Sequence, residues 1–169
     1  VLEVIGRGGM GVVLRARDTK LERVVAMKAL AAPLAVSGTA RQRFVREARA
    51  AAAVRDDHIV AIHAVCDEGP TPYLVMEFID GCNLESLIRQ RGPLEVKEIL
   101  RIGIQIANGL KAAHKQGLIH RDIKPANILL ENGVQRVKLT DFGLARAADD
   151  ASLTQSGLIA GTPMYMSPE

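Results

Sequence analysis

Apolar and polar residues alternate over the first thirty residues in the way that β-strands require. The alternation covers three segments, 1–6 (VLEVIG), 11–18 (GVVLRARD) and 23–30 (RVVAMKAL). A cluster of glycines separates the first two segments, and DTKLE separates the second from the third. Because glycine and short polar stretches mark turns, we expect three consecutive antiparallel strands.

A helix is expected after these strands. From Thr39 to about Val54 the apolar residues recur at helical spacing, and Thr39 and Gln42 have the spacing of a capping box. Two more short strands are expected at 59–65 and 73–78. The Asp80-Gly81 pair then breaks the chain.

Beyond Asp80 the pattern becomes helical. Residues 94–115 carry apolar side chains three and four positions apart, as an amphipathic helix does: Ile99, Ile102, Ile106, Leu110 and Ala113. The chain has no internal repeats. We therefore expect an α+β protein with a strand-rich front half that contains one helix, and a helical back half.

Composition narrows the class of protein. The 169 residues suit a single domain, and 48% hydrophobic with 24% charged residues is ordinary for a globular protein. No apolar stretch approaches the roughly 18 residues of a membrane span, so we expect no membrane contact from this segment. A net charge of +3 without a run of like charge favours anionic ligands weakly and gives no reason to expect nucleic acid.

The cysteines and the ends of the chain bear on its setting. Cys66 and Cys82 have neither metal-like spacing nor the number that a disulfide framework needs, which favours a reducing, cytoplasmic compartment for this domain. The chain starts inside a predicted strand and stops without a tail, so we expect an excerpt. Any membrane anchor of the full-length protein would lie outside it.

The glycine cluster GRGGMG is the first stretch with chemical content. Gly6, Gly8 and Gly11 form a G-x-G-x-x-G pattern, whose bare backbone can approach phosphate groups. A nicotinamide-dependent oxidoreductase would need a helix after Gly11, whereas the sequence continues as a strand. The cluster is therefore either a phosphate-covering hairpin or an ordinary glycine turn.

Lys28 and Glu47 are a candidate ion pair. Lys28 ends the apolar run VVAMK, and Glu47 lies in the middle of the expected helix. Lys28 could instead be an ordinary surface lysine. Glu47 could instead pair with Arg43, four residues earlier on the same helix.

The stretch HRDIKPANILL, residues 120–130, sets polar side chains directly before an apolar run. Asp122 and Asn127 flank Pro125, which excludes a regular helix and predicts an irregular loop. Asp141 follows a predicted strand in RVKLTDFG. Phosphoryl transfer needs a carboxylate to accept a hydroxyl proton, oxygen ligands for Mg²⁺, and cations for phosphate charge. Asp122, Asn127 with Asp141, and Lys124 with Lys28 match these roles in type, and ILL would be the buried strand that anchors the loop.

Six motifs in this order and spacing resemble the protein kinase superfamily: GRGGMGVV, VAMK, Glu47 in its helix, HRDIKPANILL, DFG and GTPMYMSPE. Lys124, two residues after Asp122, is similar to the serine/threonine branch. The glycine motif and the Ala-rich helix look most like bacterial Ser/Thr kinases. The resemblance implies a two-lobed kinase fold, with an N-lobe and hinge at 1–79 and a partial C-lobe at 80–169, truncated after the Ala-Pro-Glu position.

The same resemblance implies ATP and Mg²⁺ as cofactors and assigns the site. Asp122 would be the catalytic base, Lys124 would steady the γ-phosphate, Lys28 would contact the α- and β-phosphates, and Glu47 would hold Lys28. Asn127 and Asp141 would bind Mg²⁺. The remaining ATP-binding residues would cover the phosphates, enclose the adenine or lie near the ribose: Ile5, Gly6, Gly8, Gly11, Val13, Ala26, Met76, Glu77, Ile79, Asn83 and Leu129.

Regulation is implied as well. In the family an arginine at the position of Arg121 usually meets a phosphate on the loop before the Ala-Pro-Glu position. That loop contains Ser152, Thr154 and Ser156, and phosphorylation would add about 1.5 to 2 negative charges for Arg121 to pair with. We expect autophosphorylation at Thr154 and then Ser156, with self-association to bring two copies together. Thr162 is expected to position the substrate through Asp122 and Lys124.

Two departures from the family pattern and two rival functions complete the expectations. Ser167 replaces the usual alanine, and the helices that normally follow Glu169 are absent from the chain, so the helix at 94–115 should be partly bare. A pseudokinase would share the fold without catalysis. A small-molecule phosphotransferase would share the chemistry, but Lys124, Thr162 and the SPE segment favour protein substrates with Ser or Thr hydroxyls.

Overall fold

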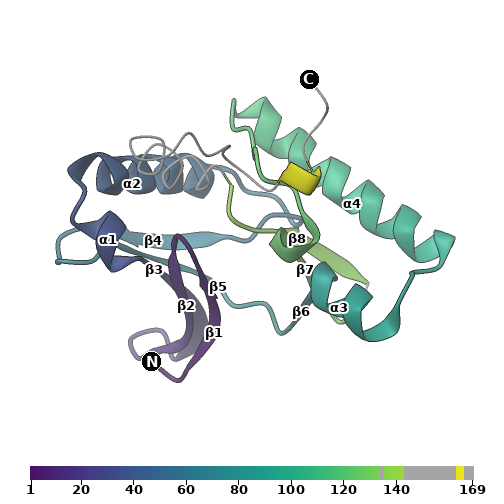
Figure 1. The fold of residues 1–169 in the computed structure, drawn as a ribbon, viewed down its shortest axis with the longest axis horizontal. Coiled ribbons are helices and arrows are strands. Elements are labelled where there is room, and N and C mark those ends of the chain that lie inside the picture. Colours follow the sequence, from purple (N-terminus) through teal and green to yellow (C-terminus); the bar gives the residue numbers. More distant parts are fainter. Residues whose placement is uncertain (134, 143–162, 166–169) are drawn as a thin grey trace.

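The computed structural model describes residues 1–133, 135–142 and 163–165. Its first part is a five-stranded antiparallel sheet in the order β1-β2-β3-β5-β4, and its second part holds a three-stranded sheet in the order β6-β7-β8 (Figure 1). The five strands of the first sheet are Glu3–Gly8 (β1), Gly11–Asp18 (β2), Arg23–Leu30 (β3), Ile62–Cys66 (β4) and Tyr73–Glu77 (β5). The second sheet contains Gly81–Asn83 (β6), Ile128–Glu131 (β7) and Arg136–Leu139 (β8).

The helices divide in the same way. Ala32–Ala35 (α1) and Gly38–Ala53 (α2) lie with the first sheet, and Leu84–Arg91 (α3) and Val96–Lys115 (α4) lie with the second (Figure 1). Two 3₁₀ turns, Pro125–Asn127 (η1) and Pro163–Tyr165 (η2), complete the described elements. This arrangement confirms the expected α+β, two-lobed fold, whereas the boundary between residues 79 and 80 stays a prediction.

The strands and helices follow the apolar pattern, with differences at their ends. Strands β1, β2 and β3 and their antiparallel pairing are confirmed. Helix α2 begins at Gly38, where Ser37 rather than Thr39 caps it by accepting a hydrogen bond from Ala40 N at 3.4 Å. Helix α4 begins at Val96, two residues later than expected, with a capping box between Glu95 and Glu98. Elements α1, α3 and β6 were not predicted.

The loop between α2 and β4 explains why β4 is shorter than the expected strand at 59–65. Leu139 N donates to His58 O at 2.8 Å and Val60 N donates to Leu139 O at 2.9 Å. Ile59 therefore forms a parallel bridge with β8 instead of extending β4. Because of this pairing, the loop that leads into β4 of the first sheet is also hydrogen-bonded to β8 of the second sheet.

Each part has its own hydrophobic core. In the first part, α2 packs on the sheet through a buried set that includes Phe44, Val45, Ala48, Leu74 and Met76. In the second part, the core lies around β7 and β8 and includes Ile102, Leu130, Val137, Leu139 and Phe142.

Helix α4 presents two different faces. Ile102 and Ala113 are buried, as expected. Ile99, expected to face the core, is exposed, and it shares the exposed surface with other apolar side chains of the helix: Val96 (72%), Leu100 (60%) and Ile104 (62%). The expectation of a partly bare helix is therefore confirmed. Among the described residues, no helix has the length and apolar character needed to cross a membrane.

Candidate active site

A cleft of about 490 Å³ lies between the two sheets. Its lining comes from β1, β2, β3, β5, α3, β7 and the segments between them. It includes nine of the residues predicted for ATP: Ile5, Gly6, Val13, Ala26, Met76, Glu77, Ile79, Asn83 and Leu129. The structure therefore brings one group of expected residues, separated by more than 120 positions in the sequence, to a single cavity. Gly8, Gly11 and Lys28 are not part of its lining.

Several residues that line the cleft were not predicted for the nucleotide. Val60, Cys82 and Thr140 are among them, and Asp141, predicted for the metal, lies at the same cavity. Asn83 lines the cleft, but its Oδ1 also accepts a hydrogen bond from Ser86 N at 2.7 Å and so caps α3. This bond uses one of the two lone pairs of Oδ1, so the other lone pair and the amide hydrogens remain for the predicted role near the ribose.

The glycine cluster forms a tight hairpin between β1 and β2. Gly8 pairs with Gly11, and Gly6 pairs with Val13. Gly11 has a φ of +144°, and a Cβ at this position would overlap the carbonyl oxygen of Ala29. Only glycine fits there. Because a strand and not a helix follows Gly11, the structure excludes the dinucleotide-binding interpretation.

Lys28 is buried in β3, which excludes an ordinary surface lysine. Its Nζ lies 2.7 Å from Asp141 Oδ1. Lys28 therefore forms an ion pair with Asp141, the predicted metal ligand. Glu47 is one of the buried residues of α2. Its pairing with Lys28 stays a prediction.

The loop that contains Asp122 concentrates the remaining polar groups. Lys124 Nζ lies 2.8 Å from Asp122 Oδ2. Asn127 Nδ2 donates to the same Oδ2 at 3.0 Å and to the backbone carbonyl of Asp122 at 2.8 Å. The Pro125–Asn127 segment is a single 3₁₀ turn, so the irregular loop expected from Pro125 is confirmed. The loop leads directly into β7, whose Ile128 and Leu130 are buried and anchor it.

Backbone contacts tie this loop to the strand that precedes Asp141. Thr140 N donates to Asn127 O at 3.1 Å. His120 Nε2 donates to Thr140 O at 2.9 Å, while its Nδ1 accepts from Asp122 N at 3.3 Å. The backbone at Asp122 and the backbone at Thr140, the residue before Asp141, are thereby joined by one network that passes through His120.

His120 was not predicted as a site residue. It is almost completely buried, and its ring lies 4.5 Å from the ring of Phe142 between centroids. Burial lowers the pKa of His120 below the usual 6.5, although the Thr140 carbonyl and the nearby Asp141 and Asp122 act in the opposite direction. A neutral imidazole with a proton on Nε2 satisfies both of its hydrogen bonds. The signal in the sequence was the position of His120 immediately before Arg121 and Asp122.

Two residues of the site have left-handed backbones. Arg121 has a φ of 66° and Asp141 a φ of 65°. Side chains other than glycine occupy this region rarely, and such strain tends to occur at functional positions. Each of these residues lies next to the hydrogen-bonded network, which holds the backbone in place.

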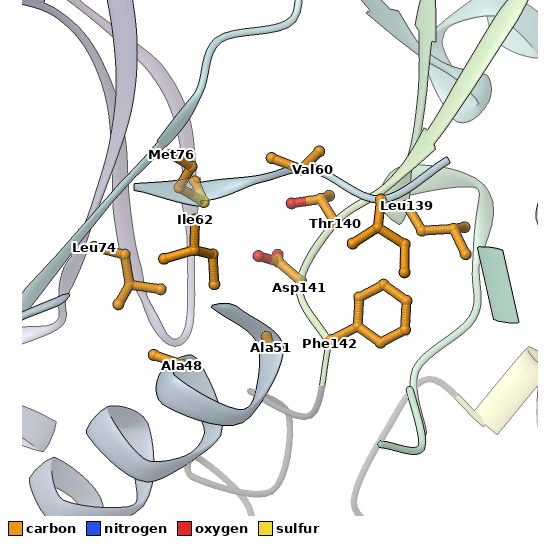
Figure 2. A pocket seen from close by; sticks show the side chains of 11 residues that line it. Ala48, Ala51, Val60, Ile62, Leu74, Met76, Leu139, Thr140, Asp141 and Phe142 are labelled. Carbon is orange, nitrogen blue, oxygen red and sulfur yellow. The ribbon is translucent and has the colours of Figure 1, made fainter. Parts of the chain in front are cut away.

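Asp141 and Phe142 extend to opposite sides of the chain. Figure 2 shows the Asp141 carboxylate pointing toward the side of Ile62 and Leu74, while the Phe142 ring points away from it. A small apolar cavity of about 20 Å³ lies between these residues and α2, where Ala48 and Ala51 line it. Asp141 lines both this apolar space and the nucleotide-sized cleft.

The residues present fit Mg²⁺. The amide nitrogen of Asn127 donates to Asp122, which leaves its Oδ1 as the atom that can serve as a ligand. The Asp141 carboxylate is partly exposed to the cleft. Within the described residues there is no group of three or more His, Cys, Asp or Glu that could hold a metal. Mg²⁺ is commonly bound through one or two protein oxygens together with substrate phosphates.

Of the residues predicted to regulate the protein or to position its substrate, the structure describes only some. Arg121 is described and exposed. The other predicted residues, Ser152, Thr154, Ser156 and Thr162, lie outside the described residues, as do Ser167 and Glu169.

Comparison with known proteins bears on the family. Residues 1–169 match the family described as "Protein kinase domain". The serine/threonine-protein kinase PknB of Mycobacterium leprae is 42% identical over 172 residues, which cover 99% of this chain and 28% of that protein. PknD of Mycobacterium tuberculosis is 43% identical over 169 residues, which cover 100% of this chain and 25% of that protein. The chain thus spans about a quarter of the length of these curated relatives.

A crystal structure of the PknI kinase domain from Mycobacterium tuberculosis superposes with a TM-score of 0.77 at 33% identity, covering 86% of this chain and 58% of the other. The match in fold agrees with the match in sequence. The chain belongs to the protein kinase family, among the bacterial serine/threonine kinases of eukaryotic type.

Proposed function

We propose that the protein transfers the γ-phosphoryl group of ATP to serine or threonine hydroxyls of protein substrates. One observation carries the proposal: the Asp122 carboxylate is held by Lys124 and Asn127 in a single loop, and that loop is hydrogen-bonded to the residue before Asp141 at the cleft. The chain is similar over its whole length to proteins named serine/threonine-protein kinases.

In this proposal Asp122 is the catalytic base. Asn127 Nδ2 and Lys124 Nζ fix the orientation of its carboxylate. The hydroxyl oxygen of the substrate attacks the γ-phosphorus, the bond to the β–γ bridging oxygen breaks, ADP leaves, and the hydroxyl proton passes to Asp122. Catalysis of this kind depends mainly on positioning and on electrostatic stabilisation of charge on the phosphoryl oxygens.

The cationic and metal-binding groups would surround the phosphates. Lys124 lies next to Asp122 and would steady the γ-phosphate. Lys28 would contact the α- and β-phosphates, with Glu47 holding it, and the glycines at positions 6, 8 and 11 would cover them. Asn127 Oδ1 and Asp141 would hold Mg²⁺, which neutralises phosphate charge when bound.

The adenine would occupy the cleft between the two sheets. Val13, Ala26 and Leu129 supply apolar lining, and Met76 and Ile5 also line the cleft. Met76 would be the gatekeeper. Backbone groups of Glu77 and Ile79 would bind the polar edge of the purine, and Asn83 would lie near the ribose. These assignments rest on the lining of the cleft and on the family pattern.

Regulation and setting are part of the proposal. Autophosphorylation at Thr154 and then Ser156 would provide a phosphate for the exposed Arg121 and would require two copies to associate. Thr162 would position the substrate hydroxyl. The domain would act in the cytoplasm, and any membrane anchor would lie elsewhere in the full-length protein.

The test is transfer of radiolabelled γ-phosphate in the presence of Mg²⁺, with the full-length protein and its Asp122→Asn variant. The variant should lose about 10² to 10⁴ in turnover, the range for a positioned general base, while ATP binding persists. Asp67→Asn is the matched control, because it neutralises a carboxylate whose partner is the exposed Arg49. Unchanged turnover in Asp122→Asn would contradict the assigned role. Nucleotide binding without transfer by the wild type would favour a pseudokinase.

A further inference from the structure

A buried lysine links the second sheet to the end of the first. Lys138 lies in β8 and is only 6% exposed. Its Nζ donates to Glu77 Oε2 at 2.9 Å, and Glu77 is the last residue of β5. Residues 77–80, here called the connector, carry the chain from the first sheet to the second. The ion pair therefore spans the two parts of the molecule beside their covalent connection.

Glu77 is also fixed within the first sheet. Ala61 N donates to Glu77 Oε2 at 3.3 Å, and Glu77 N donates to Ala61 O at 2.9 Å. The next residue of the connector, Phe78, lies 5.1 Å from the guanidinium carbon of Arg15, measured to its ring centroid. The connector thus has one side chain held by a cation of β8 and the next held by a cation of β2.

The position of this pair relates it to the candidate active site. Glu77 and Phe78 line the nucleotide-sized cleft, and together with Lys138 they also line a second groove of about 790 Å³. Lys138 precedes Asp141 by three residues, and Leu139 between them is fixed by backbone bonds to His58 and Val60. The Lys138–Glu77 pair consequently sets where β8, and with it Asp141, lies relative to the connector.

Stability alone gives a weak reason for an ion pair at this place. Removing two charges from water costs free energy that their attraction often fails to recover, and well-packed apolar residues commonly serve as well. What an ion pair adds is a defined distance between two groups. Here those groups lie on the connector, which would bind adenine, and three residues from the carboxylate that would bind Mg²⁺.

We propose that Lys138 is a positioning residue for phosphoryl transfer, which acts through Glu77 to fix the distance between the connector and Asp141. This inference rests on the proposed function. A ligand that needs both places, ATP with Mg²⁺, depends on that distance. Adenosine needs only the connector side. Its binding does not depend on that distance, because the hydrogen bonds with Ala61 keep Glu77 in place.

The experiment uses the full-length protein with Lys138→Met, which keeps the length of the side chain and removes its charge. Affinities for ATP with Mg²⁺ and for adenosine are measured by calorimetry, and turnover by phosphate transfer. Misplacing reacting groups by about 1 Å can cost about 10²-fold, so turnover should fall about ten- to hundredfold. The affinity for ATP with Mg²⁺ should fall about tenfold, while the affinity for adenosine should stay within about twofold, since only the former spans both positions.

Arg136→Met is the matched control. It removes a cation from the same strand, and its partner Glu131, at 3.4 Å, belongs to the same hairpin and not to the connector. The ratio of the two affinities should not change in this variant. Lys138→Arg should recover part of the lost affinity for ATP with Mg²⁺, because it restores a cation opposite Glu77.

Each outcome separates this inference from the proposed function. A wild type that fails to bind ATP with Mg²⁺ or to transfer phosphate contradicts the proposed function. An active wild type together with an unchanged ligand ratio in Lys138→Met shows that Lys138 is only structural. If Lys138→Met does not fold, Glu77→Gln provides the same comparison, because it removes the opposite charge while keeping the shape of the side chain.

Discussion

The Asp141 carboxylate has two prospective partners, both of them cations. It pairs with Lys28 at 2.7 Å in the structure, and we propose that it also holds Mg²⁺. An Asp141→Asn variant keeps the shape but loses the negative charge, which weakens attraction to both cations. We expect ATP binding to lose its dependence on Mg²⁺, measured by ATP titration with and without the metal. The control variant Asp67→Asn should retain the dependence on Mg²⁺. If Asp141→Asn also retained it, the Asp141 carboxylate would not be a metal ligand.

His120 gives a prediction about pH. Its pKa is lowered by burial, so at pH 6.5, where an ordinary histidine is half protonated, this ring carries less of its proton in the folded protein. Between pH 6.5 and the lower pKa of the folded state the unfolded chain binds more protons than the folded chain, so the free energy of unfolding should fall as the pH decreases through that interval.

The measurement is an NMR titration of the His120 ring, combined with denaturant unfolding at several pH values. The pKa of His63 is also lowered, by burial and by Arg23, so the two rings have to be followed separately. A His120 ring that titrates at or above 6.5 would contradict the prediction.

Sequence reasoning found single residues when their partners were close in the chain. Asp122, Lys124 and Asn127 lie within six positions, and their spacing around Pro125 was enough to predict a shared loop. The bonds of His120 reach Thr140, twenty positions away, and Lys138 reaches Glu77, sixty-one positions away. Such pairs depend on how the sheets come together, which no local pattern records.

Secondary-structure elements were likewise predicted where the signal lies within the segment, and missed where it depends on distant partners. Strands β1, β2 and β3 and helices α2 and α4 have long periodic patterns, and they were predicted within a few residues. Strand β6 is three residues long and exists only through its pairing with β7. Helix α3 has eight residues, too few for a clear periodic signal. Strand β6 and helix α3 therefore had to come from the structure.

Two glycines of α4 test how closely this helix packs on β8. A Cβ at Gly109 would lie 3.0 Å from His58 O and 3.1 Å from Leu139 Cδ1, whereas a Cβ at Gly103 would meet nothing within 4 Å. Alanine favours a helix over glycine by about 0.5 to 1 kcal/mol, and overpacking costs about 1 to 3 kcal/mol.

The free energy of unfolding should therefore rise by about 0.5 to 1 kcal/mol in Gly103→Ala and fall by about 1 to 2 kcal/mol in Gly109→Ala. Denaturant unfolding of the two variants beside the wild type measures both changes. Equal stabilisation by the two substitutions would mean that the loop at His58 moves away from α4 at little cost.

At the scale of the whole molecule, two cores are joined by the connector and by the loop after α2. Ala51, Val54 and Ile59 pack in the core of the second part, although α2 belongs mainly to the first. The change from strand-like to helical patterning near Asp80 predicted two parts. It could not predict this second junction, because residues 59–60 have the composition of an ordinary strand and their partner lies in β8.

The apolar face of α4, formed by Val96, Ile99, Leu100 and Ile104, bears on how the molecule behaves when residues 1–169 are expressed alone. Clustered apolar side chains in water favour association, which removes them from solvent. A Leu100→Glu/Ile104→Lys variant replaces two of them with charges four positions apart, which also favour the helix. We expect the wild-type segment to self-associate and this variant to do so less, as measured by sedimentation velocity over a range of concentrations. Leu21→Lys/Val36→Glu is the control, because it charges two exposed apolar positions of the first part, away from α4. If both double variants reduced association equally, the α4 face would not be its cause.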